Sequence, residues 1–224
     1  MFISLGSACI IKSVLLELNL TIKERLPFDW CGSNGKFIGD SLKTDFKYWS
    51  SPDSFYVASI HKPNNHLHIK NKHGFSGFIH DLDYTHLSSM DGYDTFYDQD
   101  GFHGDLAVKE ESMNIFIENY QRRIQRLRDL RDKEEKDLYF VFHDYQGIIE
   151  DDILNIWIGL NEFCKNKRFT LICIFHHYQD SKEEFIEYFK NERSRCLVYI
   201  YSVGKIYHQV KAKNKLIKII KEIV

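Results

Sequence analysis

The chain has 224 residues, and 30 Lys and Arg against 32 Asp and Glu give a formal net charge of -2. This balance supplies no global basic field of the kind that draws proteins to phosphate backbones, so we expect no nucleic-acid partner. No apolar run reaches the roughly 18 residues needed to cross a bilayer, and the first residues lack the pattern of a secretory signal. We therefore expect a cytoplasmic protein without a membrane partner, folded as a single domain over residues 1–224.

The cysteines are odd in number, widely spaced and free of any CxxC pair; they are Cys9, Cys31, Cys164, Cys173 and Cys196. This usage favours free thiols in a reducing compartment over a disulfide framework or a thiolate zinc site. Histidines are frequent between residues 61 and 73, but no HExxH motif, facing carboxylate pair or cysteine accompanies them. The glycine-rich phosphate signatures are also absent. We predict no metal site and no cofactor.

The chain begins with a pattern typical of strand, tight turn and helix. Residues 2–5 are a short apolar run, Gly6 supplies the turn, and apolar side chains then recur at helical spacing as far as Leu18. Ser7 is a candidate N-cap, which places Cys9 in the first helical turn. A loop over residues 19–35 follows, and then a weaker helix with Phe37 and Leu42 on its apolar face.

The middle of the chain is less regular. Residues 51–105 lack helical periodicity and contain alternating apolar stretches, so we predict short strands and loops, as an irregular insertion or small lobe. A long helix is predicted over residues 109–131, because Phe116, Tyr120, Ile124 and Leu127 share one face.

The last ninety residues alternate between two patterns. Strands are predicted at residues 138–142, 169–175 and 196–201, and helices at 149–164, 182–190 and 205–223. The strands are almost continuously apolar, which is typical of a parallel sheet covered on both faces. We therefore predict an α/β fold, a three-layer sandwich with a mostly parallel sheet. Ligands of such sheets lie at the carboxyl edge, where the turn before Cys9 and the segment at His143 should both emerge.

Cys9 is the first candidate for chemistry. A thiol of pKa near 8.5 is only about 3% thiolate at neutral pH, and a helix N-terminus worth roughly 0.3 to 1 kcal/mol lowers that pKa by less than one unit. An efficient nucleophile therefore needs a nearby imidazolium as well. Backbone amides at the same helix start, from Gly6 and Ser7 onward, would then form an oxyanion hole. The alternative is that Cys9 packs as a small hydrophobe in the core.

Three positions offer a histidine to this thiol. His80 ends an alternating stretch and is followed by Asp81, while His143 ends a predicted strand at the same sheet edge as Cys9. The pair at residues 176–177 ends the next strand. Because neighbouring side chains on a strand point to opposite faces, Asp81 orients His80 only if the strand has ended. A structural, hydrogen-bonded role remains open for each histidine.

Two further segments combine charge with aromatic rings. In PFDW, residues 27–30, Asp29 either caps backbone amides beside an anchoring Trp30 or orients the catalytic histidine. In YQRRI, residues 120–124, Arg122 and Arg123 either clamp a substrate carboxylate or phosphate, or form a solvated helix face.

Four motifs together resemble a known family. ISLGSAC at residues 3–9, PFDW at 27–30, FIHD at 78–81 and YQRRI at 120–124 follow the order found in the family described as putative papain-like cysteine peptidases. The resemblance implies Cys9 as nucleophile, His80 as base, and Asp29 or Asp81 as the orienting acid. It also implies, as an alternative fold, a papain-like α+β arrangement in which the nucleophile helix packs on an antiparallel sheet.

The leading interpretation is a thiol-dependent hydrolase or acyl transferase that acts on an amide or ester carbonyl of a peptide or small molecule. Two alternatives remain. A Rossmann-like half and an arginine-bearing helix also suit a sugar or nucleotide-sugar transferase or hydrolase. A non-catalytic interaction domain would instead use Cys9 and the aromatic residues as core.

Overall fold

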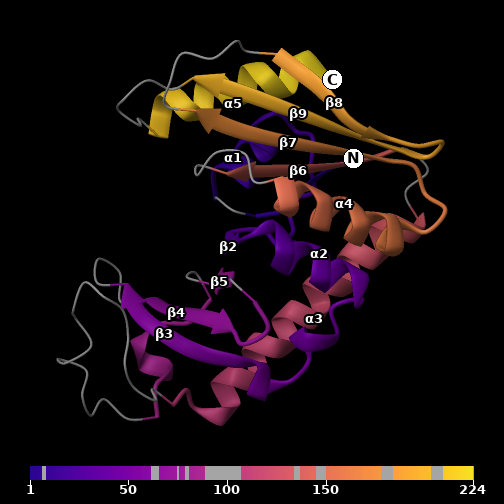
Figure 1. Cartoon of the computed structure of the whole chain (residues 1–224). Helices are drawn as coiled ribbons and strands as arrows, with labels where there is room; N and C mark the ends of the chain where they lie inside the picture. Colours follow the sequence, from indigo (N-terminus) through magenta and orange to yellow (C-terminus); the bar gives the residue numbers. More distant parts are fainter. Residues whose placement is uncertain are drawn as a thin grey trace.

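The structure, a computed structural model, describes residues 1–6, 9–61, 66–74, 76–78, 81–88, 107–133, 137–144, 150–177, 184–202 and 209–223. Within these ranges the chain forms two sheets with helices packed on and between them (Figure 1). The mostly parallel sheet lies in the upper part of Figure 1 and the antiparallel sheet in the lower part. The long helix α3 (Glu110–Lys133) runs from the lower part to the upper part.

The first sheet has the strand order β1-β6-β7-β9-β8. Strands β1 (Phe2–Ser4), β6 (Leu138–Asp144), β7 (Phe169–His177) and β9 (Ser194–Ser202) are parallel to one another. Residues 140–143 and 171–175 are all buried. Continuous burial of this kind arises where both faces of a sheet are covered, as their apolar runs predicted.

Helices cover the two faces of this sheet. Helices α1 (Cys9–Glu17) and α5 (Gln209–Ile223) pack with one face, through residues such as Val14, Ile220 and Val141. Helix α4 (Glu150–Cys164) packs on the opposite face, where Ile156 meets the cluster that contains Phe140. The layers are therefore helix, sheet and helix, and the predicted α/β fold with a mostly parallel sheet is confirmed. In the papain-like alternative the first helix would lie on an antiparallel sheet, whereas α1 packs on the parallel one.

One predicted element is wrong. Residues 182–190 were expected to form a helix, but Glu184–Lys190 is strand β8, which pairs antiparallel with β9 at the edge of the sheet. The segment is rich in aromatic and β-branched residues, and Ile186 lies opposite Val198 in the register. Pairing with an otherwise open strand outweighs the helical spacing of its apolar residues, because strand preference depends on cross-strand neighbours.

The second sheet is antiparallel, with the order β2-β5-β4-β3. Its strands are β2 (Cys31–Ser33), β3 (Phe55–His61), β4 (His66–Asn71) and β5 (Ser76–Phe78). The predicted short strands between residues 51 and 105 therefore exist where the chain is described, interspersed with 3₁₀ turns at Pro52–Ser54 and Tyr84–His86. The assignment of the segment as a lobe of one domain stays a prediction.

Helix α2 (Gly35–Lys43) connects the two halves by packing tightly on α4. A Cβ atom on Gly39 would lie 2.2 Å from the carbonyl oxygen of Asn155, and one on Gly159 would lie 2.5 Å from that of Gly39. The helices can approach this closely only because these positions carry no side chain. In α3 the four residues predicted to share an apolar face are all buried. No helix in the described ranges has the length and apolar character needed to cross a membrane.

Candidate active site

The turn that follows β1 depends on Gly6. Its φ of +85° lies in the left-handed region, and a Cβ atom there would lie 3.0 Å from the carbonyl oxygen of Cys31 and 3.2 Å from that of Phe28. A side chain at this position would be strained both by its own backbone and by its neighbours. Gly6 thus brings the ISLGSAC turn against the PFDW loop. Helix α1 begins at Cys9, whose side chain lies outside the described part, as does Ser7.

A buried ion pair joins α1 to the same loop. The ammonium group of Lys12, one turn after Cys9, lies 2.8 Å from Oδ2 of Asp29, and both side chains are at most 1% exposed. Lys12 also donates to the carbonyl oxygens of Ile22, at 2.9 Å, and Glu24, at 3.2 Å. Three acceptors match the three donors of an ammonium group, so its charge is buried with its hydrogen bonds satisfied.

Asp29 is held mainly by structural contacts. Its Oδ2 also accepts a hydrogen bond from the amide of Leu26 at 2.8 Å, while Oδ1 is buried without a hydrogen-bond partner in the described part of the chain. Burial raises the pKa of the Asp29 carboxyl, and the neighbouring Lys12 opposes that rise. These contacts are of the amide-capping kind, and the role of Asp29 in orienting a histidine stays a prediction. Trp30, next in the chain, is half-buried with a φ of +65°.

Asp81 has a different set of partners. Its carboxylate accepts hydrogen bonds from the hydroxyl of Tyr120 at 2.7 Å and from Arg123 at 2.5 Å, and Arg25 lies 3.3 Å away. Burial would raise the pKa of this carboxyl, but the hydrogen bond and charge of Arg123 outweigh it, so the pKa is lowered. Asp81 lies beyond strand β5 (Ser76–Phe78), and its role in orienting His80 stays a prediction. His80 itself lies outside the described residues.

The two arginines of YQRRI lie on different faces of α3. Arg123 is buried, with its guanidinium 4.3 Å from the centre of the Tyr120 ring, and belongs to the Asp81 cluster. Arg122 is exposed and donates to the side chain of Asn119. The structure therefore brings Arg123 together with the predicted site residue Asp81 and leaves Arg122 apart from them.

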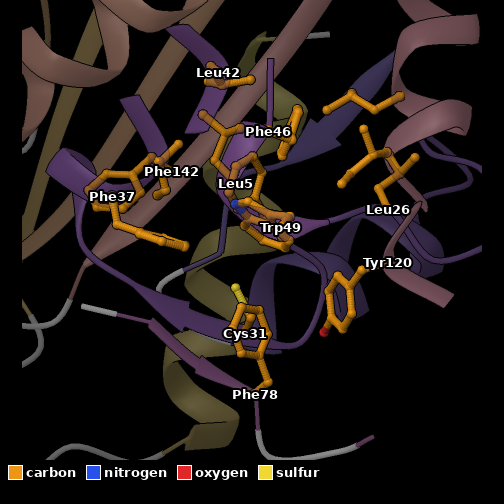
Figure 2. Close-up of a cluster of buried hydrophobic side chains, with 14 of the residues drawn as sticks. Leu5, Leu26, Cys31, Phe37, Leu42, Phe46, Trp49, Phe78, Tyr120 and Phe142 are labelled. Carbon is orange, nitrogen blue, oxygen red and sulfur yellow. The ribbon is translucent and has the colours of Figure 1, made fainter. Parts of the chain in front are cut away.

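The four motifs converge through the core. Strand β2, which follows PFDW, pairs with β5, which leads into FIHD, with Cys31 opposite Phe78. Figure 2 shows one aromatic and aliphatic cluster that includes Leu5, Phe78 and Tyr120, which come from three of the motifs. Phe28 of the PFDW loop joins it through Trp49, whose ring centre lies 5.6 Å away. Segments far apart in sequence thus share the core that Leu5, at the end of β1, joins.

His143 lies on the sheet face that α1 covers. Val141, two residues earlier on β6, packs in the cluster that holds α1, and side chains two apart on a strand share a face. His143 is fully buried, and its Nε2 lies 3.2 Å from the hydroxyl of Tyr201 on β9. Both possibilities, an alternative base and a structural histidine, therefore remain predictions. The histidines at residues 176 and 177 end β7, and their side chains are outside the described part.

Two partners in this region escaped sequence reasoning. Lys12 was not singled out, although a lone charge in the otherwise apolar start of α1 is a signal that could have found it. Arg25 had no such signal, because it lies among other charged residues of a loop. Among the side chains that the structure describes, no three His, Cys, Asp or Glu residues gather as a metal site would require.

Comparison with known proteins gives one match. Residues 1–177 match the model of a family described as "Putative papain-like cysteine peptidase (DUF1796)". The match spans all four motifs and most of the parallel sheet. Neither the curated proteins nor the solved structures contain a match.

Proposed function

The chain belongs to the family described as putative papain-like cysteine peptidases, and on that premise we propose that it is a thiol-dependent hydrolase or acyl transferase acting on an amide or ester carbonyl. The nucleophile in this proposal is Cys9 and the general base is His80. The substrate class is a peptide, an amide or a small molecule with an activated acyl group.

The observation that carries the proposal is that the four motifs, far apart in sequence, meet in one core. Gly6 fits against the carbonyl groups of Phe28 and Cys31, and Lys12 fixes the next turn of α1 to Asp29. Asp81, next to His80 in the chain, is fixed by Tyr120 and Arg123. Such rigid support is what a catalytic pair needs, since small displacements of reacting groups cost large factors in rate.

The chemistry follows from a helix start and a histidine. His80 removes the proton of the Cys9 thiol, the sulfur attacks the carbonyl carbon, and the carbonyl oxygen takes the negative charge. Backbone amides at the start of α1 stabilise that oxyanion. His80 then returns the proton to the departing amine or alcohol as the acyl thioester forms. Water, or a second nucleophile in a transferase, attacks the thioester and regenerates the thiol.

The cluster at Asp81 has a positioning part in this scheme. Tyr120 and Arg123 hold the Asp81 side chain in place, and in this scheme Asp81 fixes the chain next to His80. His143 is the second candidate base, supported by its place on the face that α1 covers.

A peptidyl vinyl sulfone, which traps reactive catalytic thiols, tests the proposal on the full chain. We expect labelling at Cys9, located by peptide mass spectrometry, and its loss in Cys9→Ser with the fold retained by circular dichroism. His80→Ala should slow labelling by about a hundredfold or more, the lower end of the typical contribution of a general base.

His86→Ala is the matched control, because His86 is a half-exposed histidine on a 3₁₀ turn outside the proposed catalytic pair. It should label at the wild-type rate. If His143→Gln slows the labelling of Cys9 and His80→Ala does not, the general base is His143 and not His80. A Cys9 that labels no faster than free cysteine, with no effect of either histidine, would refute thiol catalysis.

A further inference from the structure

A pocket of about 740 Å³ opens between α3 and the segment that follows α2, apart from the residues that the thiol chemistry uses. We call it the α3 pocket. Its volume falls in the roughly 300–1,000 Å³ range of small-molecule sites. Three of its lining residues, Phe46, Trp49 and Ile124, are buried and give it an apolar base. An apolar base of this kind suits an apolar side chain or a ring.

One wall of the α3 pocket has an unusual backbone. Asp45 and Phe46 are consecutive non-glycine residues with φ values of +49° and +62°. Arg128 from α3 holds this turn, donating through Nε to Oδ1 of Asp45 and through its terminal nitrogen to the Asp45 carbonyl oxygen, both at 3.1 Å. Strain of this kind persists where neighbours enforce it, and it recurs at ligand sites. Arg128 and Asp45 thus neutralise each other and shape the wall.

Three other charged residues line the pocket without an opposite charge. Arg122, Lys47 and Glu118 are exposed lining residues, and none forms an ion pair in the described part of the chain. Glu118 and Arg122 have the spacing of a helix ion pair, four residues apart. Arg122 instead donates to Asn119, so both charges stay available. The ammonium group of Lys47 lies 5.8 Å from the centre of the Tyr48 ring, a weak contact that a ligand carboxylate can replace. The pocket therefore offers the guanidinium of Arg122, one carboxylate and this second cation above an apolar base.

We propose that the α3 pocket binds a small zwitterion with an apolar side chain, of the class of free α-amino acids. Arg122 and Lys47 would receive the ligand carboxylate, since a guanidinium binds a carboxylate through two parallel hydrogen bonds. Glu118 would receive the ammonium group, while the side chain enters the space lined by Phe46 and Trp49. The opposite signs along the pocket explain why a purely anionic ligand fits less well, because Glu118 would repel it.

Isothermal titration of the full chain tests this with three probes that share a ring. L-phenylalanine carries both charges, phenylacetate only the carboxylate, and phenethylamine only the ammonium group. We expect L-phenylalanine to bind at least about tenfold more tightly than phenylacetate or phenethylamine, because each charge-assisted hydrogen bond adds to affinity. Arg122→Gln should weaken L-phenylalanine and phenylacetate by about tenfold and leave phenethylamine unchanged, and Glu118→Gln should show the reverse selectivity.

Arg193→Gln and Glu111→Gln serve as controls, since both residues are exposed and neither lines the α3 pocket. They should bind all three probes as the wild type does. The proposal is overturned if L-phenylalanine gives no saturable heat up to about 50 mM, well above the millimolar affinity of a minimal ligand. It is equally overturned if phenylacetate binds as tightly as L-phenylalanine, or if neither Arg122→Gln nor Glu118→Gln changes the binding.

Discussion

Removing the Lys12 ammonium group should be among the most destabilising single changes in this chain. Lys12→Met keeps the length and apolar stem of the side chain but abolishes three contacts, of which the ion pair with Asp29 at 2.8 Å is the shortest. Both partners are almost fully buried, so solvent does not screen the pair. Loss of one partner from such a pair costs about 3–5 kcal/mol, a large part of the roughly 5–15 kcal/mol that holds a domain folded.

The loss should depend on pH in a defined direction. Burial raises the pKa of Asp29 and Lys12 opposes that rise, so Lys12→Met raises the pKa further. A group whose pKa is raised by folding contributes most stability below its unfolded pKa and loses it as the pH rises through its folded pKa. The deficit of Lys12→Met should therefore be largest at neutral pH and should shrink in acid, where the carboxyl group is uncharged.

Urea unfolding followed by tryptophan fluorescence, at neutral pH and at about pH 5, measures this deficit. Adding Asp29→Asn to Lys12→Met removes the stranded charge and keeps an oxygen to accept the Leu26 amide, so the double variant should recover about 1 kcal/mol or more at neutral pH. A deficit below about 1 kcal/mol that does not change with pH would refute the reasoning that this is a buried charge pair.

Two other predictions concern packing and acid stability. Gly39→Ala should lower the free energy of unfolding by about 1–3 kcal/mol, because its Cβ would lie 2.2 Å from the Asn155 carbonyl oxygen. Gly32→Ala is the control, because its Cβ would have no neighbour within 4 Å, and it should cost below about 0.5 kcal/mol. Equal losses of stability in Gly39→Ala and Gly32→Ala, measured by thermal unfolding, would contradict this account. Asp81→Asn should cost about 1–3 kcal/mol at neutral pH. Because Arg123 lowers the pKa of Asp81, the wild type loses its extra stability over Asp81→Asn as the pH falls through that lowered pKa. A stability difference that persists in strong acid would show that the charge of Asp81 is not the source of the extra stability.

The sequence predicted the elements whose pattern is local. Tyr120 and Leu127 are buried on one face of α3, and the apolar run around Phe140 forms a covered parallel strand. Strand β8 was wrong because FIEYF at residues 185–189 fits both a helix and a strand, and pairing with β9 decides between them. That pairing is a property of the assembled sheet, which no short window of sequence contains.

The candidate site was predictable as a set of motifs but not as a geometry. Gly6 and Cys9 lie at the turn and helix start that their spacing predicted. The partner of Asp81, however, is Arg123, which lies 42 residues further along the chain. Arg122 and Arg123 cannot be distinguished in sequence. The orientation of α3 about its axis buries Arg123 beside Asp81 and leaves Arg122 at the surface.

The pKa of the Cys9 thiol tests the central claim most directly. A helix N-terminus contributes at most about 1 kcal/mol, and one pKa unit corresponds to about 1.36 kcal/mol, so a larger shift needs an imidazolium. The measurement is the pH dependence of iodoacetamide alkylation at Cys9 in the folded chain, with peptide mass spectrometry to locate the adduct. We predict a pKa more than about one unit below the ordinary 8.5, which His80→Ala returns to within one unit of that value. A pKa at or above about 8.5 that His80→Ala leaves unchanged would contradict the account.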